Sequence, residues 1–159
     1  MATSLKNLSE YDPSALPDGS SFSIGIAVAD WNSEVTHALL EGAVKTLMEA
    51  GVKESNIEIR HVPGTFELPL ACSWMAQQQR THAVIGLGCV IQGETRHFDF
   101  ICESTANAMQ NVALQTNKPC VFGVLTTNNQ EQALARAGGH HGNKGDEAAV
   151  TALKMIAIR

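Results

Sequence analysis

The sequence predicts a protein of the α/β class, built as a three-layer α/β/α sandwich around a four-stranded parallel sheet. Segments with the apolar patterns of strands alternate four times with segments whose apolar residues recur at helical spacing. The connections between consecutive strands are too long for hairpins, so each must contain a helical crossover between parallel strands. Both observations indicate a doubly wound sheet with helices on both faces.

The first predicted strand covers residues 22–29, which are mostly small or β-branched. Asn32 or Ser33 can cap the helix that follows, and its apolar positions recur at helical spacing until Gly51 ends the pattern. This segment therefore forms the first strand and its crossover helix.

The second strand is expected over residues 56–62, where apolar residues alternate with polar or charged ones. Such alternation marks a strand with one exposed face, most simply at the edge of the sheet. A helix follows over residues 67–79, because Pro69 is tolerated in a first helical turn. Residues 83–91 form the third strand.

A long helix begins at about Phe98 and ends before Pro119, which cannot continue it. The fourth strand follows over residues 120–125, and two further helices are expected over residues 131–136 and 146–158. The resulting order of elements is that of a flavodoxin-like, doubly wound sheet.

The length of 159 residues suits one domain with a substantial core. Residues 1–21 are polar and contain proline and glycine, so we expect an N-terminal arm that becomes ordered only against another surface, or else a free tail. Such an arm could add a strand to the sheet of a neighbouring subunit. Residues 22–159 then form the single domain.

The formal net charge of −5 disfavours nucleic acid and anionic membranes as partners, and leaves small molecules or other proteins. The N-terminus has no apolar stretch of signal-peptide length, and no window approaches a membrane span. We therefore expect a cytoplasmic protein.

The cysteines are far apart, and each lies within or beside an apolar pattern. We expect buried, reduced, structural thiols at Cys72, Cys89, Cys102 and Cys120. His140 and His141 are adjacent, a spacing that does not suit a zinc site, and no cysteine or carboxylate pair completes a ligand set, so we expect no metal site in the protein.

In a doubly wound sheet, ligands bind beyond the carboxyl ends of the strands. The segments that leave those ends are Trp31-Asn32, Pro63 to Glu67, Gln92 to His97 and Thr126 to Asn128. Taken alone, His97 could simply face solvent and Trp31 could belong to the core. Together the segments bring an aromatic ring, a carboxylate, a hydroxyl and a histidine to one rim, which predicts a pocket for a planar, hydrogen-bonding, partly anionic ligand.

The segment around His97 has the clearest chemistry. An apolar run breaks at Gly93 into a loop with Thr95, and the helix that begins near His97 directs its free N–H groups and positive dipole end at that loop. An anionic group would bind well there. Because histidine can take and give a proton near neutral pH, the loop could hold a phosphate and move protons beside it.

Motifs from Ile24 onward resemble the lumazine synthase family of riboflavin biosynthesis. The segments that carry the resemblance are Trp31-Asn32, Val62 to Pro69, Gly88 to Phe98, Glu131 to Ala133, Arg136 to Gly138 and Gly142 to Gly145. The resemblance implies a transferase that condenses 5-amino-6-(D-ribitylamino)uracil with 3,4-dihydroxy-2-butanone 4-phosphate. The products are 6,7-dimethyl-8-ribityllumazine, phosphate and water, and no cofactor takes part.

The same resemblance implies the roles of individual residues. His97 is the proton carrier, and Arg136 stabilises the departing phosphate together with groups of Glu94 and Thr95. The other implied substrate contacts are the stacking ring of Trp31, the ribityl contacts of Thr65, Phe66 and Glu67, the backbone of Cys89, Val90 and Ile91 at the uracil, Phe122 against the heterocycle, and the positive charge of Lys144.

Two residues depart from the pattern. Gln92 stands where many members have a basic residue, and His140 where several have lysine, so the positive field around the phosphate would be weaker. Because His97 and Arg136 are present, we still expect activity.

The resemblance also implies a homo-oligomer. Phe122 lies near the start of its strand, opposite the pocket, so a neighbouring copy must supply it, and with it Arg136. The family forms pentamers, and the compact turn over residues 136–145 resembles members that assemble sixty subunits into an icosahedral shell. Against the shell, Pro13 and Pro17 could keep the arm from pairing with a neighbouring sheet edge. Riboflavin synthase is a further partner suggested by the resemblance.

Two other functions share some of these sequence features. A dinucleotide-binding oxidoreductase is suggested by Gly86, Gly88 and Gly93, but these glycines do not open the first helix and lack the fingerprint spacing. A non-catalytic flavin- or lumazine-binding module of flavodoxin-like fold would want a glycine-containing phosphate loop after the first strand, and residues 30–33 contain none.

Overall fold

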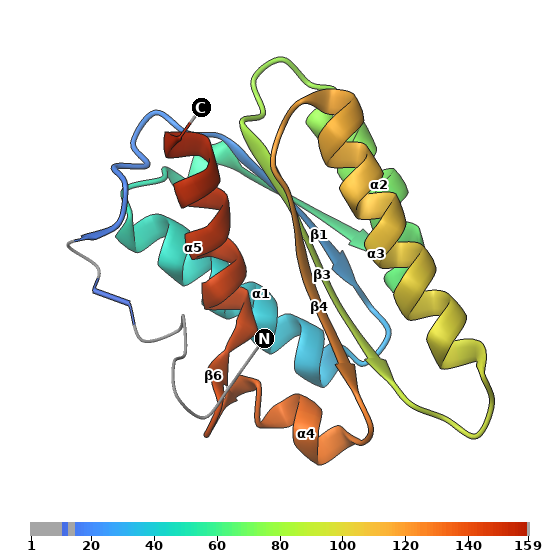
Figure 1. The fold of residues 1–159 in the computed structure, drawn as a ribbon. Helices are drawn as coiled ribbons and strands as arrows, with labels where there is room; N and C mark the ends of the chain where they lie inside the picture. Colours follow the sequence, from blue (N-terminus) through green and yellow to red (C-terminus); the bar gives the residue numbers. More distant parts are fainter. Residues whose placement is uncertain (1–10, 13–14, 159) are drawn as a thin grey trace.

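The computed structural model describes residues 11–12 and 15–158 (Figure 1). Most of the predicted N-terminal arm, including Pro13, therefore lies outside the described residues. The described part of the arm contacts its own chain. The Tyr11 hydroxyl lies 3.0 Å from Thr46 Oγ1 and donates to Glu49 Oε2 at 3.1 Å, and the Gly19 amide donates to the Ala50 carbonyl at 2.7 Å.

The sheet has the strand order β2-β1-β3-β4, and all neighbouring strands run parallel. Its strands are β1 (Ile24–Ala29), β2 (Ile57–Val62), β3 (Ala83–Ile91) and β4 (Cys120–Thr127). The predicted fold class is therefore confirmed, and so is the predicted edge position of β2.

Helices cover both faces of the sheet, which gives three layers (Figure 1). Helices α1 (Ser33–Glu49) and α5 (Lys144–Ala157) pack together on one face, and α2 (Leu68–Ala76) and α3 (His97–Thr116) on the other. A short helix, α4 (Gln130–Leu134), follows β4. The 3₁₀ turns η2 (Glu54–Asn56) and η3 (Thr65–Glu67) precede β2 and α2.

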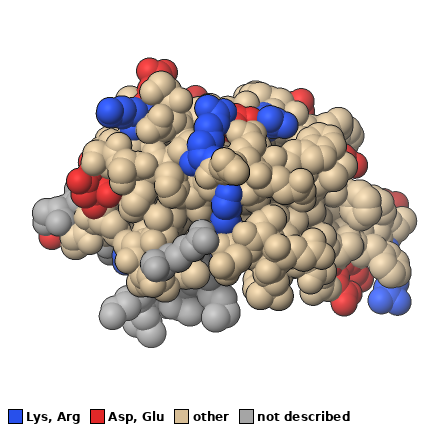
Figure 2. All heavy atoms as spheres, turned by 90° about the horizontal axis from the view of Figure 1, so that it is seen from above, with Lys and Arg blue, Asp and Glu red and all other residues tan. Residues whose placement is uncertain are grey.

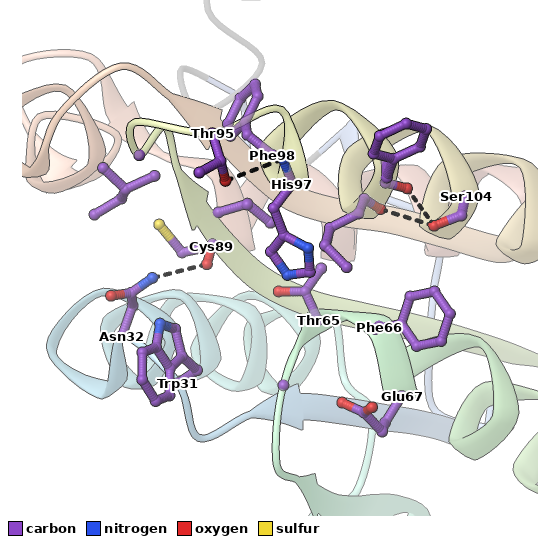
Figure 3. Close-up of a pocket in the computed structure, with 16 residues that line it drawn as sticks. Trp31, Asn32, Thr65, Phe66, Glu67, Cys89, Thr95, His97, Phe98 and Ser104 are labelled. Atoms are coloured by element: carbon purple, nitrogen blue, oxygen red, sulfur yellow. Dashed lines mark hydrogen bonds between the residues drawn. The ribbon is translucent and has the colours of Figure 1, made fainter.

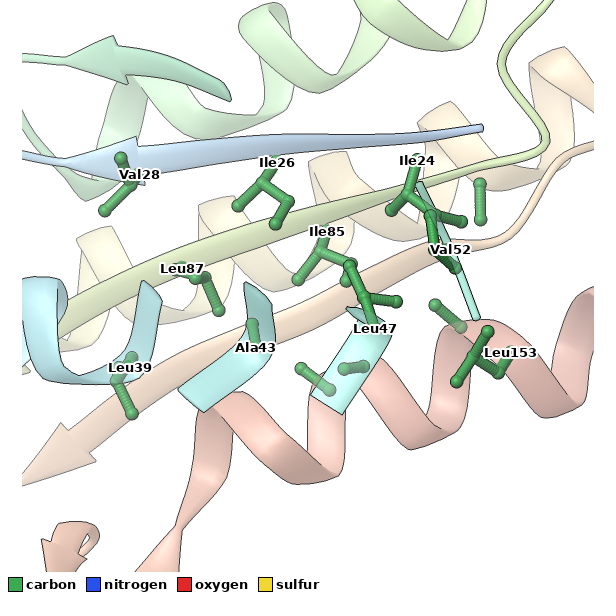
Figure 4. Packing of buried hydrophobic residues seen from close by; sticks show 14 of the residues in the cluster. Ile24, Ile26, Val28, Leu39, Ala43, Leu47, Val52, Ile85, Leu87 and Leu153 are labelled. Atoms are coloured by element: carbon green, nitrogen blue, oxygen red, sulfur yellow. The ribbon is translucent and has the colours of Figure 1, made fainter. Parts of the chain in front are cut away.

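The core has one cluster on each face of the sheet. Along β1, Ile24, Ile26 and Val28 point toward α1 and α5 (Figure 4). Ala27 and Ala29 belong to the second cluster, with residues of α2 and α3. Every residue of β1 is buried, as alternation between two covered faces requires. This explains the continuous apolar run that predicted a central strand.

The largest difference from the predicted elements lies after β4. The helix expected over residues 131–136 ends at Leu134, and the next residues form a small antiparallel hairpin of β5 (Ala137–Gly139) and β6 (Gly142–Asn143). Gly138 and Gly142 adopt φ of 107° and 73°, which only glycine tolerates easily. Helix α5 begins two residues earlier than expected because the Asn143 side chain accepts a hydrogen bond from the Gly145 amide.

Other boundaries differ by a few residues. Helix α2 ends at Ala76, three residues before the predicted end, and β4 extends through Thr127, two residues beyond its predicted end.

Among the helices of the described chain, none has the length and apolar character that a membrane crossing requires. Seen from the end of Figure 1 where the N-terminal ends of β3 and β4 lie, charged residues of both signs are scattered among uncharged ones (Figure 2).

Candidate functional site

A cavity of about 880 Å³ opens at the carboxyl ends of the central strands (Figure 3). The loop after β1, the turn η3, the end of β3 and the first turns of α3 surround it. The lining residues are Trp31, Asn32, Gly64, Thr65, Phe66, Glu67, Cys89, Val90, Ile91, Gly93, Thr95, His97, Phe98, Phe100, Ile101 and Ser104. Three of the four predicted rim segments contribute residues to this cavity, whereas the segment after β4, Thr126 to Asn128, contributes none.

The loop after β1 places a large aromatic ring at the cavity. Trp31 is 73% exposed, and its amide donates to the Pro63 carbonyl at 3.2 Å. Asn32 lies at the N-cap position of α1 in a left-handed conformation, with φ of 60°. The sequence suggested that the side chain of Asn32 or Ser33 caps this helix, but the Asn32 side chain makes no capping hydrogen bond. Instead its amide donates to the Cys89 carbonyl at 2.9 Å, which joins this loop to β3.

The second wall is the turn η3. Thr65 is buried against β3, because Gly88 leaves room for it: a Cβ at Gly88 would lie 2.8 Å from Thr65 Oγ1. Phe66 and Glu67 are exposed at the cavity, with 58% of Phe66 accessible. The turn therefore offers a hydroxyl, an aromatic ring and a carboxylate side by side (Figure 3).

The floor is the end of β3. Cys89 is buried, and burial raises the pKa of its thiol from the ordinary value of 9.0 to about 11. The thiol is therefore protonated at neutral pH and is a poor nucleophile. Val90 and Ile91 are half-buried beside it.

The last wall holds the titratable group. His97 is the first residue of α3, is exposed, and extends toward Thr65 across the cavity (Figure 3). Its amide donates to Thr95 Oγ1 at 3.4 Å, which ties the loop to the helix start. The positive end of the α3 dipole therefore faces the cavity, where it favours an anionic group.

The remaining predicted site residues do not line this cavity. Glu94 is exposed on the loop before α3. Phe122, which is 40% exposed, lies near the start of β4, opposite Gly86 of β3 and toward the other end of the sheet. Arg136 and Lys144 lie on either side of the β5–β6 hairpin.

Arg136 and Lys144 flank the hairpin that carries His140 and His141. The Lys144 amide donates to the Arg136 carbonyl at 2.9 Å, Arg136 Nη1 donates to the Gln132 carbonyl at 3.0 Å, and Lys144 pairs with Glu147. The pKa of His141 is lowered, first by desolvation and then by the charges of His140, Arg136 and Lys144. The nearby positive charges therefore disfavour protonation of His141.

The structure adds several lining residues that sequence reasoning did not single out. Phe100, Ile101 and Ser104 belong to the first turns of α3, together with Phe98. Ile101 and Ser104 follow His97 at helical spacing, four and seven residues on, so they share its face. That spacing was the available signal.

All four cysteines are free thiols, as expected. Cys72 and Cys89 are buried, but Cys102 and Cys120 are only partly buried, so the expectation of full burial was wrong for these two. Cys102 lies on α3, and Cys120 begins the edge strand β4; both positions are covered incompletely within one chain.

The sequence is similar to known proteins over nearly its whole length. The model of the 6,7-dimethyl-8-ribityllumazine synthase family matches residues 21–159. A 6,7-dimethyl-8-ribityllumazine synthase from Cytophaga hutchinsonii is 57% identical over 157 residues, covering 99% of this chain and 98% of that protein. Proteins of the same name from Porphyromonas gingivalis and Parabacteroides distasonis are 51% and 49% identical, and the matches cover 99% and 98% of this chain and 98% of each relative.

Proposed function

The chain belongs to the 6,7-dimethyl-8-ribityllumazine synthase family, and we propose that His97 and Arg136 are its principal catalytic residues. The enzyme is a transferase of riboflavin biosynthesis. It condenses 5-amino-6-(D-ribitylamino)uracil with 3,4-dihydroxy-2-butanone 4-phosphate to give 6,7-dimethyl-8-ribityllumazine, phosphate and water. The observation that best supports the residue roles is the single cavity onto which Trp31, Thr65 and His97 all face.

His97 is the proton carrier in this proposal. Imine formation, phosphate elimination, ring closure and dehydration each move a proton, and an imidazole can both accept and donate one near neutral pH. His97 is exposed to the cavity, and the Thr95 hydroxyl contacts its amide rather than its ring. The ring therefore remains available to the reacting atoms.

Trp31 and η3 hold the heterocyclic substrate. The exposed Trp31 ring is large enough to stack on a pyrimidine, and the backbone of residues 89–91 lies at the cavity floor to contact the uracil edge. Thr65 and Glu67 offer hydrogen-bonding groups for the ribityl hydroxyls. A substrate held in this way is oriented for attack, and orientation alone can supply a large part of the rate enhancement.

Arg136, Lys144 and Thr95 stabilise the phosphate group. The Arg136 guanidinium can bind phosphate oxygens through two parallel hydrogen bonds, and negative charge increases on the phosphate as it departs. Desolvation is the first cause of the lowered pKa of His141, and the charges of Arg136 and Lys144 at the same hairpin lower it further. Glu94 contributes its backbone N–H at the loop before α3.

Neighbouring subunits complete the site. In one chain, the cavity is not lined by Arg136, Lys144 or Phe122, which supports their supply from an adjacent copy. Such head-to-tail sharing between identical subunits closes into a ring. We propose a pentamer, and twelve pentamers in an icosahedral shell of sixty subunits, in the cytoplasm and with riboflavin synthase as a partner. The compact turn over residues 136–145 supports the shell.

The function is tested by incubating the purified protein with both substrates. We expect one lumazine, detected by its absorbance, and one phosphate per turnover. A protein that binds flavin or lumazine but leaves the substrates unchanged would be the non-catalytic module instead. That alternative is not favoured, because the chain retains both Arg136 and His97.

A further inference from the structure

A second group of functional side chains lies just outside the cavity. Asp30, His37 and His61 come from three different elements, and one oxygen or nitrogen of each lies within 4.8 Å of the other two. All three side chains are exposed. Asp30 directly precedes Trp31, so this group adjoins the loop that forms one wall of the cavity.

The register of the sheet explains why these residues meet. His61 of β2 pairs with Val28 of β1, and paired residues of parallel strands point to the same face. Val28 packs beneath α1, so His61 also faces α1. Asp30 lies two residues beyond Val28 and continues that face, while the early turns of α1 bring His37 above it.

The contacts within the group are specific. His61 Nδ1 and Asp30 Oδ1 lie 2.8 Å apart. The rings of His37 and His61 meet edge to face, with centroids 5.8 Å apart and an interplanar angle of 84°. An ion pair between His61 and Asp30 does not require His37. The position of the second imidazole beside this pair therefore needs an explanation of its own.

We propose that Asp30, His37 and His61 form a binding site for a divalent late transition-metal ion of the zinc, nickel or copper class. Two imidazoles and a carboxylate are a ligand set that such ions favour, whereas magnesium and calcium prefer oxygen ligands alone. Three protein ligands leave at least one position for water.

The geometry requires only a small adjustment. Two ligand atoms that share a tetrahedral zinc ion lie about 3.3 Å apart, given bonds of about 2.0–2.1 Å. The largest separation in the group is bounded by 4.8 Å, so a shift of about 1.5 Å in exposed side chains brings the ligands together. Glu34 and Glu41 lie three residues before and four residues after His37 on α1, and their charges add to the attraction for a cation.

His140 and His141, the other pair of neighbouring histidines, are a less favourable place for a metal ion. His140 and His141 stack with centroids 4.2 Å apart, but the neighbouring Arg136 and Lys144 help to lower the pKa of His141, and the same positive charges oppose a metal ion. A metal ion bound by Asp30, His37 and His61 would instead link the carboxyl ends of β1 and β2 to α1, next to Trp31. The site stands independently of the catalytic roles given above.

Equilibrium dialysis of the tag-free full chain against Zn²⁺ tests the site. We expect one Zn²⁺ per chain, no comparable binding of Mg²⁺, and a loss of affinity of roughly tenfold or more in His37→Ala and in His61→Ala. Asp30→Asn should also bind more weakly. His82→Gln is the matched control, because it removes an exposed imidazole elsewhere in the chain and should bind Zn²⁺ like the wild type.

The variants change exposed side chains, and circular dichroism is used to check that each one folds. Cobalt(II) in place of Zn²⁺ gives a second readout, since visible d–d bands should appear in the wild type and disappear in His61→Ala. The proposal is overturned if the wild type binds no Zn²⁺, or if His37→Ala and His61→Ala bind it as tightly as His82→Gln does.

Discussion

The side-chain amide of Asn32 donates a 2.9 Å hydrogen bond to the backbone carbonyl of Cys89, and so joins the loop after β1 to the end of β3. Asn32 makes this bond from a left-handed backbone conformation, which asparagine tolerates better than most residues. The bond fixes the loop that carries Trp31 beside the cavity floor. Both the stability of the fold and the binding of a stacked ligand should depend on it.

Asn32→Ala and Asn32→Gly separate the two contributions. Both remove a hydrogen bond with a net value of about 1 kcal/mol, but only alanine adds the strain of positive φ, about 1–2 kcal/mol. In urea unfolding at fixed protein concentration, we expect Asn32→Ala to be the less stable variant. If the two variants unfolded at the wild-type midpoint, the bond would have no structural role.

His97→Ala should lower turnover by about one hundred to ten thousand fold, the range for losing a positioned acid–base group. Its exposed position at the start of α3 predicts that the fold is unchanged. Steady-state assays measure the effect, with His82→Gln as a control that should keep wild-type turnover. Activity of His97→Ala within a factor of two of wild type would refute the assignment.

Arg136→Ala should chiefly weaken binding of the phosphorylated substrate, because it removes a guanidinium contact to the phosphate and leaves the stacking surface of Trp31 intact. Trp31→Ala should show the opposite preference and weaken the ribitylaminouracil. Titration calorimetry of each substrate compares the two variants. Equal losses of affinity for both substrates in Arg136→Ala would contradict its role.

The Cys89 thiol should be slow to react with iodoacetamide. With its pKa raised to about 11 by burial, roughly one thiol in a thousand is ionised at pH 8, and labelling should accelerate about tenfold per pH unit up to pH 11. Mass spectrometry of labelled peptides measures the rate. Labelling of Cys89 at the rate of a free cysteine peptide would show that the thiol is not buried.

The raised pKa of the Cys89 thiol makes the free energy of unfolding depend on pH. The folded pKa of Cys89 lies above the ordinary value, so the folded state keeps the proton while the unfolded thiol ionises. This stabilisation is complete below about pH 9 and is lost as pH rises from 9 toward 11. Cys89→Ala should therefore lose less stability than wild type over that range in urea unfolding, and parallel curves would contradict the shift.

The sequence predicted the central elements best. Strand β3 has the predicted bounds, residues 83–91, and the equally buried β1 ends at Ala29 as predicted but starts at Ile24, two residues later than expected. The hairpin of β5 and β6 was missed, because its short strands depend on glycines in left-handed conformations and on contacts with α1. No local periodicity could indicate it.

The candidate site was predictable where the residues follow strand ends, as Trp31 and His97 do. The bond from Asn32 to Cys89 was not, because the sequence favours asparagine as a helix cap at that position and only the packing of β1 beside β3 offers the alternative acceptor. The group of Asp30, His37 and His61 was likewise invisible, since it depends on the register of β1 with β2.

Co-refolding equal amounts of His97→Ala and Arg136→Ala tests the proposal of a shared site most directly. If one copy supplies His97 and its neighbour supplies Arg136, random assembly restores about one quarter of the sites, and activity should rise to about one quarter of wild type. As a control, wild type co-refolded with the double variant should give about one quarter for a shared site and about one half for a site within one chain. If the mixture of single variants shows no activity beyond that of its parents, His97 and Arg136 act within one chain and the shared site is contradicted.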